Sequence, residues 1–165
     1  MEQMELKLRS VDIATELAES PTEFEDWGPR DKSAMPADLE RWVIELHSDA
    51  SVVDVGNMSC HSVWYGPTSG SRAMNIGIHV LAEFRGQGIG SSAQEMLAHL
   101  LHDRGIVRVE ASTDVKNSAE KAALARAGFV CEGVLRQAQG RAEAYMISKC
   151  GRILRESCTS MDAGF

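Results

Sequence analysis

A glycine-rich segment, Arg85-Gly86-Gln87-Gly88-Ile89-Gly90, constrains the possible folds of this chain more than any other feature. It follows a run with the alternating pattern of a strand, residues 72–80, and opens an apolar pattern of helical period that ends near Gly105. Glycines at alternating positions let backbone N–H groups converge, because no Cβ atoms stand in the way. The dipole of the following helix and the charge of Arg85 attract the same anion. The order of strand, loop and helix therefore predicts an anion site, and a turn needed only for chain geometry is the alternative.

Two familiar phosphate motifs fit this loop poorly. The P-loop requires a lysine and a hydroxyl residue after its last glycine, and this pattern is absent. The dinucleotide fingerprint GxGxxG would place glycine at Ser91 and a tight turn directly after a parallel strand, whereas Leu81-Ala82-Glu83-Phe84 intervenes here. Glu110 does lie about twenty residues beyond the loop, as that fingerprint requires. Nucleotide binding therefore stays a weaker rival.

The N-terminal third of the chain predicts one strand and two helices. Leu6 and Leu8 alternate with charged residues, which is typical of an edge strand. Ser10 then offers a helix N-cap, and a loop is expected over residues 21–36. The apolar face of the first helix would carry Ile13, Leu17 and Ala18. The second helix is expected from apolar residues at i, i+3, i+4 and i+7, which are Leu39, Trp42, Val43 and Leu46.

The remainder predicts a sheet with two further helices. Three strands at about 51–58, 60–66 and 72–80 form an antiparallel meander, and in the third Asn75, Gly77 and His79 share one face. A strand at about 106–112, a helix at about 118–127 and a strand from Phe129 follow the glycine loop and its helix. We therefore expect an α/β or α+β fold with a mixed sheet over residues 1–149, and a peripheral tail over 150–165.

The composition of the chain excludes several classes of binding partner. A formal net charge of -7 argues against a nucleic-acid binder, which needs a basic face. The sequence has neither a leader pattern nor an apolar stretch long enough for a bilayer, so we expect a cytoplasmic protein without a membrane partner. The four cysteines have no close spacing, which predicts free thiols and no metal site.

Several spaced motifs resemble one family. The segment Arg85–Gly90 is similar to the [RQ]-x-x-G-x-[GA] acetyl-CoA motif of the GNAT superfamily of N-acetyltransferases. Asn117, Gly128-Phe129, Glu132-Gly133 and Arg136 resemble the N…GF…EG…R series of its RimJ/RimL-like branch, and the similarity spans about residues 5–147. The resemblance implies a mostly antiparallel sheet splayed around an acyl-CoA site and flanked by helices. It also implies direct transfer of an acetyl group from acetyl-CoA to a primary amine.

The resemblance further implies which residues hold the coenzyme. Val80 and Leu81 would pair with the pantetheine arm through their backbone, and Asn117 would lie beside the arm. The pyrophosphate would be held by Arg85, Gly86, Gln87, Gly88, Ile89, Gly90 and Ser91.

Three residues are candidates for the base that takes a proton from the amine. Glu110 shares the polar face of its strand with Arg108 and Ser112, and a cross-strand ion pair is its alternative role. Histidine is a frequent general base, which makes His79 a candidate, but a structural histidine is the more frequent finding. Glu120 occupies a position where relatives often carry Ala or Ser, and it also completes a capping box with Asn117, the role we favour.

Two departures from the family pattern concern the chemistry. Leu124 stands where many relatives carry a tyrosine proposed to protonate the leaving thiolate, so the acid is unassigned and water is an alternative. The segment 140–146 is shorter than the hairpin that walls the acceptor site in relatives, which implies a more open pocket, an unusual acceptor or weakened catalysis. We expect a small-molecule amine as acceptor, such as an amino acid, polyamine or antibiotic-like amine. A protein N-terminus and a catalytically silent acyl-CoA-binding module are the alternatives, and the chain is expected to be a monomer or homodimer.

Overall fold

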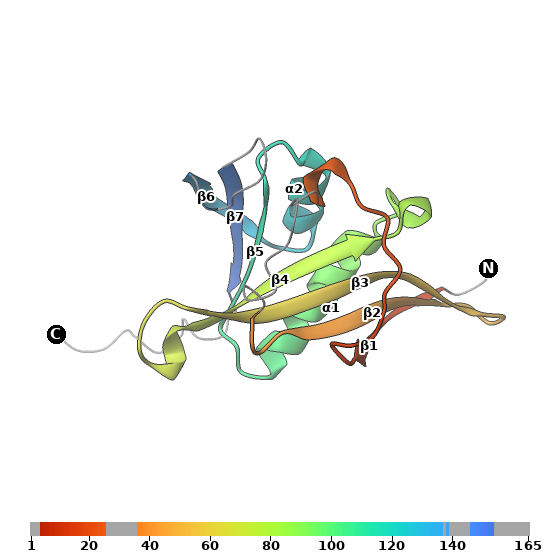
Figure 1. The fold of residues 1–165 in the computed structure, drawn as a ribbon, viewed down its shortest axis with the longest axis horizontal. Coiled ribbons are helices and arrows are strands. Elements are labelled where there is room, and N and C mark those ends of the chain that lie inside the picture. The colour runs from red at the N-terminus through yellow and green to blue at the C-terminus, as the bar shows by residue number, and fades with distance from the viewer. Residues whose placement is uncertain (1–3, 26–35, 137, 139–145, 154–165) are drawn as a thin grey trace.

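A single sheet organises the chain in the computed structural model, which describes residues 4–25, 36–136, 138 and 146–153. Its strands follow the order β1-β2-β3-β4-β5-β7-β6, and only the β4–β5 pair is parallel (Figure 1). The strands are β1 (Glu5–Val11), β2 (Glu40–His47), β3 (Val52–Trp64), β4 (Arg72–Val80), β5 (Arg108–Asp114), β6 (Val130–Arg136) and β7 (Met146–Ile153). The helices are α1 (Ile89–Asp103) and α2 (Ser118–Arg126). The predicted mixed sheet is therefore confirmed. Among the described residues, no helix is long and apolar enough to cross a membrane.

The helix predicted from Leu39 to Leu46 is wrong, because residues 40–46 belong to β2. Trp42 and Ile44 belong to the core, and Val43 on the opposite face is also buried, with 2% of its surface exposed. A strand covered on both faces carries a continuous apolar run that masks the alternation of period two. The spacing at i, i+3 and i+4 arose from that run.

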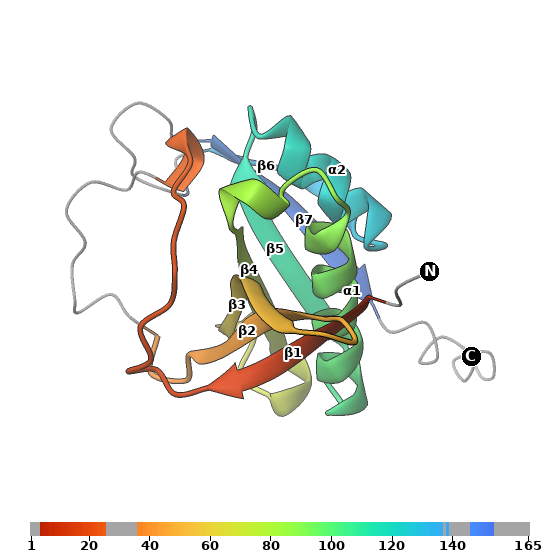
Figure 2. The ribbon, with the colours of Figure 1, turned by 90° about the vertical axis from the view of Figure 1, so that its right-hand side faces the viewer.

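The helix predicted after Ser10 is also wrong. β1 continues to Val11, and residues 12–25, which we call the strap, then run across the face of the sheet opposite the helices (Figure 2). Arg41 Nη1 donates to the carbonyl oxygens of Ile13 at 2.7 Å and Thr15 at 3.1 Å. Leu17 and Val43 line the same small cavity, so the apolar residues of the strap cover the second face of β2.

The strands predicted at 51–58 and 60–66 are one strand, β3, which pairs with β4 over the full length of β4. This pairing brings β3 very close to the end of β4 at Gly56, where a Cβ atom would lie 2.3 Å from the carbonyl oxygen of His79. Only glycine fits there without moving the end of β4.

Both helices pack on one face of the sheet (Figure 2). The buried face of α1 carries Ile89, Ala93, Leu97 and Leu101, and α1 ends just before Gly105, as predicted. α2 buries only Leu124 against this core. Since α1 connects the parallel strands β4 and β5, the glycine loop stands at the carboxyl end of β4.

The parallel pairing of β4 and β5 is short. It joins Ala73–Ile76 to Arg108–Ala111 and stops there, so Gly77–Val80 and Ser112–Asp114 diverge. The sheet is splayed at this point, as the family resemblance implied.

Residues 150–153, the first part of the predicted tail, belong to the sheet. β7 extends past Lys149 to Ile153 and lies between β5 and β6, and Cys150 is buried with 3% of its surface exposed. Residues 154–165 lie outside the described part of the chain, as does the predicted short hairpin except for Met146.

Candidate active site

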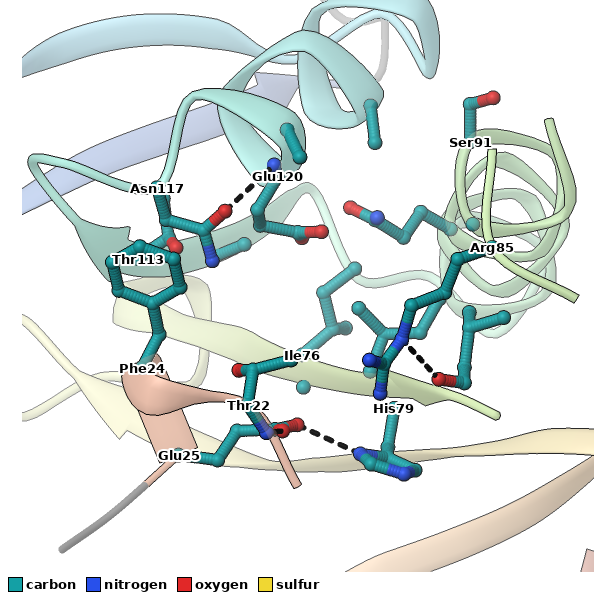
Figure 3. Close-up of a pocket in the computed structure, with 18 of the residues that line it drawn as sticks. Thr22, Phe24, Glu25, Ile76, His79, Arg85, Ser91, Thr113, Asn117 and Glu120 are labelled. Carbon is teal, nitrogen blue, oxygen red and sulfur yellow. Dashed lines mark hydrogen bonds and ion pairs between the residues drawn. The ribbon is translucent and has the colours of Figure 1, made fainter. Parts of the chain in front are cut away.

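A cavity of about 670 Å³ opens where β4 and β5 diverge (Figure 3). It is lined by the strap, β3, β4, the glycine loop, the first two turns of α1, the end of β5 and α2. A volume of this size is typical of pockets for small molecules and cofactors.

The glycine loop forms one end of this cavity. Gly86 and Gly88 have φ angles of 76° and 83°, a conformation that other residues rarely adopt. The first hydrogen bond of the helix runs from Ser92 N–H to the carbonyl of Gly88, so the N–H groups of the preceding residues have no helical acceptor. Gly88 is the N-cap and supplies no side chain to them. The loop therefore presents backbone N–H donors at this end of the cavity.

The residues of the loop contribute unequally. Arg85, Gly86, Gly88, Gly90 and Ser91 line the cavity. The Gln87 side chain instead donates to the carbonyl of Glu83 at 3.1 Å, and Ile89 packs into the core. Gln87 and Ile89 can contribute backbone groups only.

Arg85 is turned toward the strap as well as the cavity. Its Nε donates to the carbonyl of Val80 at 2.9 Å, and its Nη2 donates to the carbonyl of Ser20. The Arg85 guanidinium, which we expect to bind the diphosphate, thus also holds the strap to the end of β4.

Val80 and Leu81, the two residues predicted to pair with the pantetheine arm, point their backbone groups in opposite directions. Leu81 N–H donates to the carbonyl of Val55 at 2.9 Å, and the Leu81 carbonyl accepts from Phe84 N–H at 3.0 Å. Since neighbouring residues of an antiparallel strand point their backbone groups in opposite directions, those of Val80 and Ile78 face the opening toward β5. Ile78 and the N–H of Val80, rather than Leu81, present the free edge of β4, because the Val80 carbonyl already accepts from Arg85 Nε.

Asn117 is the N-cap of α2, and its Oδ1 accepts from Glu120 N–H at 3.1 Å. The second half of the predicted capping box does not form, because Asn117 N–H donates to the carbonyl of Asp114 instead. The Glu120 side chain points away from this turn and into the cavity (Figure 3).

Glu120 is the cavity carboxyl with the most altered acidity. Burial raises its pKa to about 7, the nearby amide of Gln94 tempers the rise, and the negative charge of Glu25 adds to it. Its pKa therefore lies near neutral pH, where a general base is most effective.

His79 also lines the cavity, but both of its ring nitrogens are engaged. Nδ1 lies 2.7 Å from Glu25 Oε1, and Nε2 accepts from Ser20 N–H at 2.7 Å. The ring is therefore the Nδ1–H tautomer in this arrangement. His79 holds the strap, in agreement with the structural alternative.

Glu110 lies away from the cavity. It is 2% exposed, and its Oε2 accepts from Tyr65 O–H at 2.7 Å and from Arg108 Nε at 3.0 Å. Arg108 also binds Glu132 on β6 with both terminal nitrogens. Of the three candidate bases, Glu110 is thus the one that does not line the cavity; its ion pair is formed within its own strand.

Comparison with known proteins identifies the family. The acetyltransferase (GNAT) domain matches residues 6–130. The chain belongs to the acetyltransferase (GNAT) family. No curated protein matches the sequence.

Solved GNAT structures share the fold. RimJ of Mycobacterium smegmatis, in complex with CoA-disulfide, is 26% identical with a TM-score of 0.60, over 73% of this chain and 55% of that protein. RimL, a ribosomal L7/L12 alpha-N-protein acetyltransferase in complex with coenzyme A, is 25% identical with a TM-score of 0.56, over 70% of this chain and 62% of that protein. The ribosomal-protein-S5-alanine acetyltransferase of Vibrio fischeri, 19% identical with a TM-score of 0.59 over 72% of this chain and 63% of that protein, supports the fold alone. The chain spans less than two thirds of the length of these GNAT proteins.

Gln94 is among the cavity residues of this GNAT domain that were not singled out from the sequence. Gln94 lines the cavity from α1 and is 1% exposed, and neither of its amide atoms has a hydrogen-bond partner in the described structure. Its spacing gave a signal, because it lies three residues after Ser91 and four after Gly90, on the helix face that adjoins the loop.

Proposed function

We propose that this GNAT chain is an N-acetyltransferase that moves the acetyl group of acetyl-CoA directly to a primary amine. The main support for this proposal is that one continuous cavity joins the glycine loop to the opening between β4 and β5. It begins at the backbone donors of Gly86–Ser91 and continues into the opening beside the free edge of β4. A diphosphate suits the first feature, and an extended arm with amide groups suits the second.

Acetyl-CoA would supply an activated thioester, and this chain's residues would handle the proton of the amine. The attacking amine must be neutral, so a base has to remove a proton from its ammonium form. We assign this role to Glu120, because its carboxyl lines the cavity and its pKa is about 7. Leu124 is 1% exposed in the core and offers no proton, which leaves water as the acid for the departing thiolate.

The acidic side chains of the strap and α2 suit a cationic acceptor, although Arg85 and Arg126 also line the cavity. Glu19, Glu25 and Glu120 line it, and the position of Glu25 is close enough to raise the pKa of Glu120. An ammonium group would be attracted to this region before its deprotonation. A small-molecule amine and a protein N-terminus both satisfy this requirement. RimL, described as a ribosomal L7/L12 alpha-N-protein acetyltransferase, favours the protein N-terminus at least as well as the small molecule we expected from the sequence.

Release of the CoA thiol from acetyl-CoA tests the proposal with two acceptor panels. One panel contains polyamines, amino acids and aminoglycoside-like amines, and the other contains peptides with different N-terminal residues. We expect release that depends on an acceptor, with an acetylated product detected by mass spectrometry. Glu95→Gln serves as a control, because Glu95 is exposed on α1 and does not line the cavity.

Each other outcome contradicts a defined part of the proposal. Binding of acetyl-CoA without thiol release for any acceptor would favour a silent acyl-CoA-binding module. A chain that neither binds acetyl-CoA nor gains thermal stability from it would contradict the coenzyme site itself.

A further inference from the structure

The strongest unexplained feature of the cavity is the side chain of Gln94. It is 1% exposed, and both its Nε2 and its Oε1 lack a hydrogen-bond partner among the described residues. Buried polar groups are almost always paired, because an unpaired group loses its bonds to water without replacement. An apolar side chain at this position would avoid that loss. Gln94 therefore carries a polar group that this cavity does not satisfy by itself.

The neighbours of Gln94 locate its amide within the cavity. Ser91 lies three residues earlier on the same helix face, so Gln94 is about 4.5 Å further along the axis of α1. One turn before Gln94, a Cβ atom at Gly90 would contact Val80 Cγ2 at 3.9 Å and Ile78 Cδ1 at 4.0 Å. Because α1 runs antiparallel to β4, Gln94 lies deeper in the opening than the backbone donors of the loop.

Glu120 approaches the same amide from α2. The two groups are close enough for Gln94 to affect the acidity of the carboxyl, but they do not meet in the geometry of a hydrogen bond. The amide therefore remains available to a molecule that enters between the two helices and β4.

We propose that Gln94 binds the coenzyme by pairing its side-chain amide with an amide of the pantetheine arm, an inference that rests on the proposed function. The Gln94 amide offers one kind of donor and one acceptor, and a ligand amide offers the complementary pair. A carboxylate would satisfy only Nε2, and an ammonium only Oε1. The position of Gln94, one helical turn beyond the diphosphate site, matches an arm that leaves the loop and runs along the free edge of β4.

In this role Gln94 contributes to the affinity for the pantetheine arm and not to the affinity for the nucleotide. Three probes measure the two contributions separately. Calorimetry would compare coenzyme A, pantetheine alone and adenosine 3′-phosphate 5′-diphosphate on wild type, Gln94→Leu and Glu95→Leu. Glu95→Leu is the matched control, because it places leucine on an exposed position of the same helix.

We expect Gln94→Leu to weaken coenzyme A and pantetheine by about three- to thirty-fold, the effect of one or two lost hydrogen bonds. The affinity for adenosine 3′-phosphate 5′-diphosphate should not change. Without ligand, the melting temperature of Gln94→Leu should rise by about 2–6 °C, because an unpaired buried amide is removed. A variant that is more stable alone yet binds coenzyme A less tightly is the signature of a ligand-binding amide.

Three results would overturn this inference. They are unchanged affinity of Gln94→Leu for coenzyme A, an equal loss for the nucleotide probe, and a lower melting temperature of the ligand-free variant, which would make Gln94 a structural residue. A more conservative change, Gln94→Met, keeps the side-chain length and repeats the test if leucine perturbs the packing. Failure of wild type to bind coenzyme A would instead contradict the proposed function, so the two failures are distinguishable.

Discussion

His79 and Glu25 are joined by a 2.7 Å hydrogen bond between the ring Nδ1 and the carboxyl Oε1, which ties the strap to β4 (Figure 3). The other ring nitrogen accepts from Ser20 N–H, and the carbonyl of Ser20 accepts from Arg85. Arg85 begins the glycine loop. One continuous set of hydrogen bonds thus connects a wall of the cavity to the proposed diphosphate site.

Glu25→Gln tests the contribution of this connection to stability. The carboxyl accepts from Thr22 N–H at 2.6 Å as well as facing His79, and a glutamine would present a donor to one of them. We expect a loss of about 1–2 kcal/mol in the free energy of unfolding at pH 7. Chemical denaturation measures it, and Glu23→Gln is the control because Glu23 is exposed in the same short turn.

The effect of Glu25→Gln should depend on pH with a definite sign. Burial alone would raise the pKa of Glu25, but the hydrogen bonds from His79 and Thr22 outweigh it and hold the pKa below its ordinary value of 4.5. The carboxylate therefore stabilises the fold fully above pH 4.5, and this stabilisation is lost as pH falls through the lower folded pKa. A difference between wild type and variant that stays constant down to strongly acidic pH would contradict the assignment.

Gly88→Ala tests whether the loop conformation is required. A Cβ atom at Gly88 would meet nothing within 4 Å, so the φ angle of 83° is the sole source of strain. An alanine in this region costs about 1–2 kcal/mol. We expect a stability loss of this size and a weaker affinity for coenzyme A, measured by thermal melting and calorimetry.

Gly70→Ala is the matched control for the loop. Its Cβ atom would also meet nothing within 4 Å, but Gly70 has no positive φ angle and lies in the turn between β3 and β4. Equal destabilisation by the two substitutions would show that the left-handed conformation of Gly88 is not the cause.

The loop and α1 could be predicted because their signals are local. Glycines at positive φ, the start of a helix at Ile89 and its end near Gly105 all follow from neighbouring residues. The predictions failed where tertiary contacts decide the structure. β2 looked helical because the strap covers its outer face, and the strap looked helical because Leu17 faces Val43 rather than a helix neighbour.

The different surroundings of the two candidate carboxyls, Glu110 and Glu120, could not be predicted for a related reason. From the sequence, Glu110 is a polar residue of a strand and Glu120 is a polar residue at the start of a helix. Only the packing shows that their surroundings differ. Tyr65, which follows β3, donates to Glu110 from a residue far away in the sequence. Glu120 faces Glu25 of the strap, a segment whose path the sequence did not reveal.

Glu110→Gln distinguishes a structural carboxyl from a catalytic one. The substitution removes the charge that accepts from Arg108 and Tyr65 in a buried position. Because Arg108 keeps Glu132, we expect a loss of about 2 kcal/mol in stability, less than for a fully broken buried pair. Once the protein is folded, the pH dependence of kcat/KM should match wild type. Loss of the acidic limb of that profile in Glu110→Gln would make Glu110 the base after all.

Glu120→Gln should increase the stability of the fold, in contrast to Glu110→Gln, because burial disfavours the charged form of the Glu120 carboxyl. Its folded pKa of about 7 exceeds the ordinary value of 4.5, so stability falls as pH rises from 4.5 to about 7 and stays low above it. Glutamine carries no charge and avoids this fall. We expect the variant to be more stable than wild type by about 2 kcal/mol at pH 8 and equal to it near pH 4.5. Denaturation at several pH values measures the difference, with Glu95→Gln as the exposed control.

The same substitution should impair acetyl transfer. A base with a pKa of about 7 gives wild type a kcat/KM that rises with pH through that value. Without the carboxyl, the rate should drop by about 10²–10⁴-fold and lose this rise, since the amine then depends on water for deprotonation. Coenzyme A affinity should remain, which calorimetry verifies. A variant that is more stable, still binds coenzyme A and yet keeps the wild-type pH profile would remove Glu120 from the reaction and leave proton removal to water.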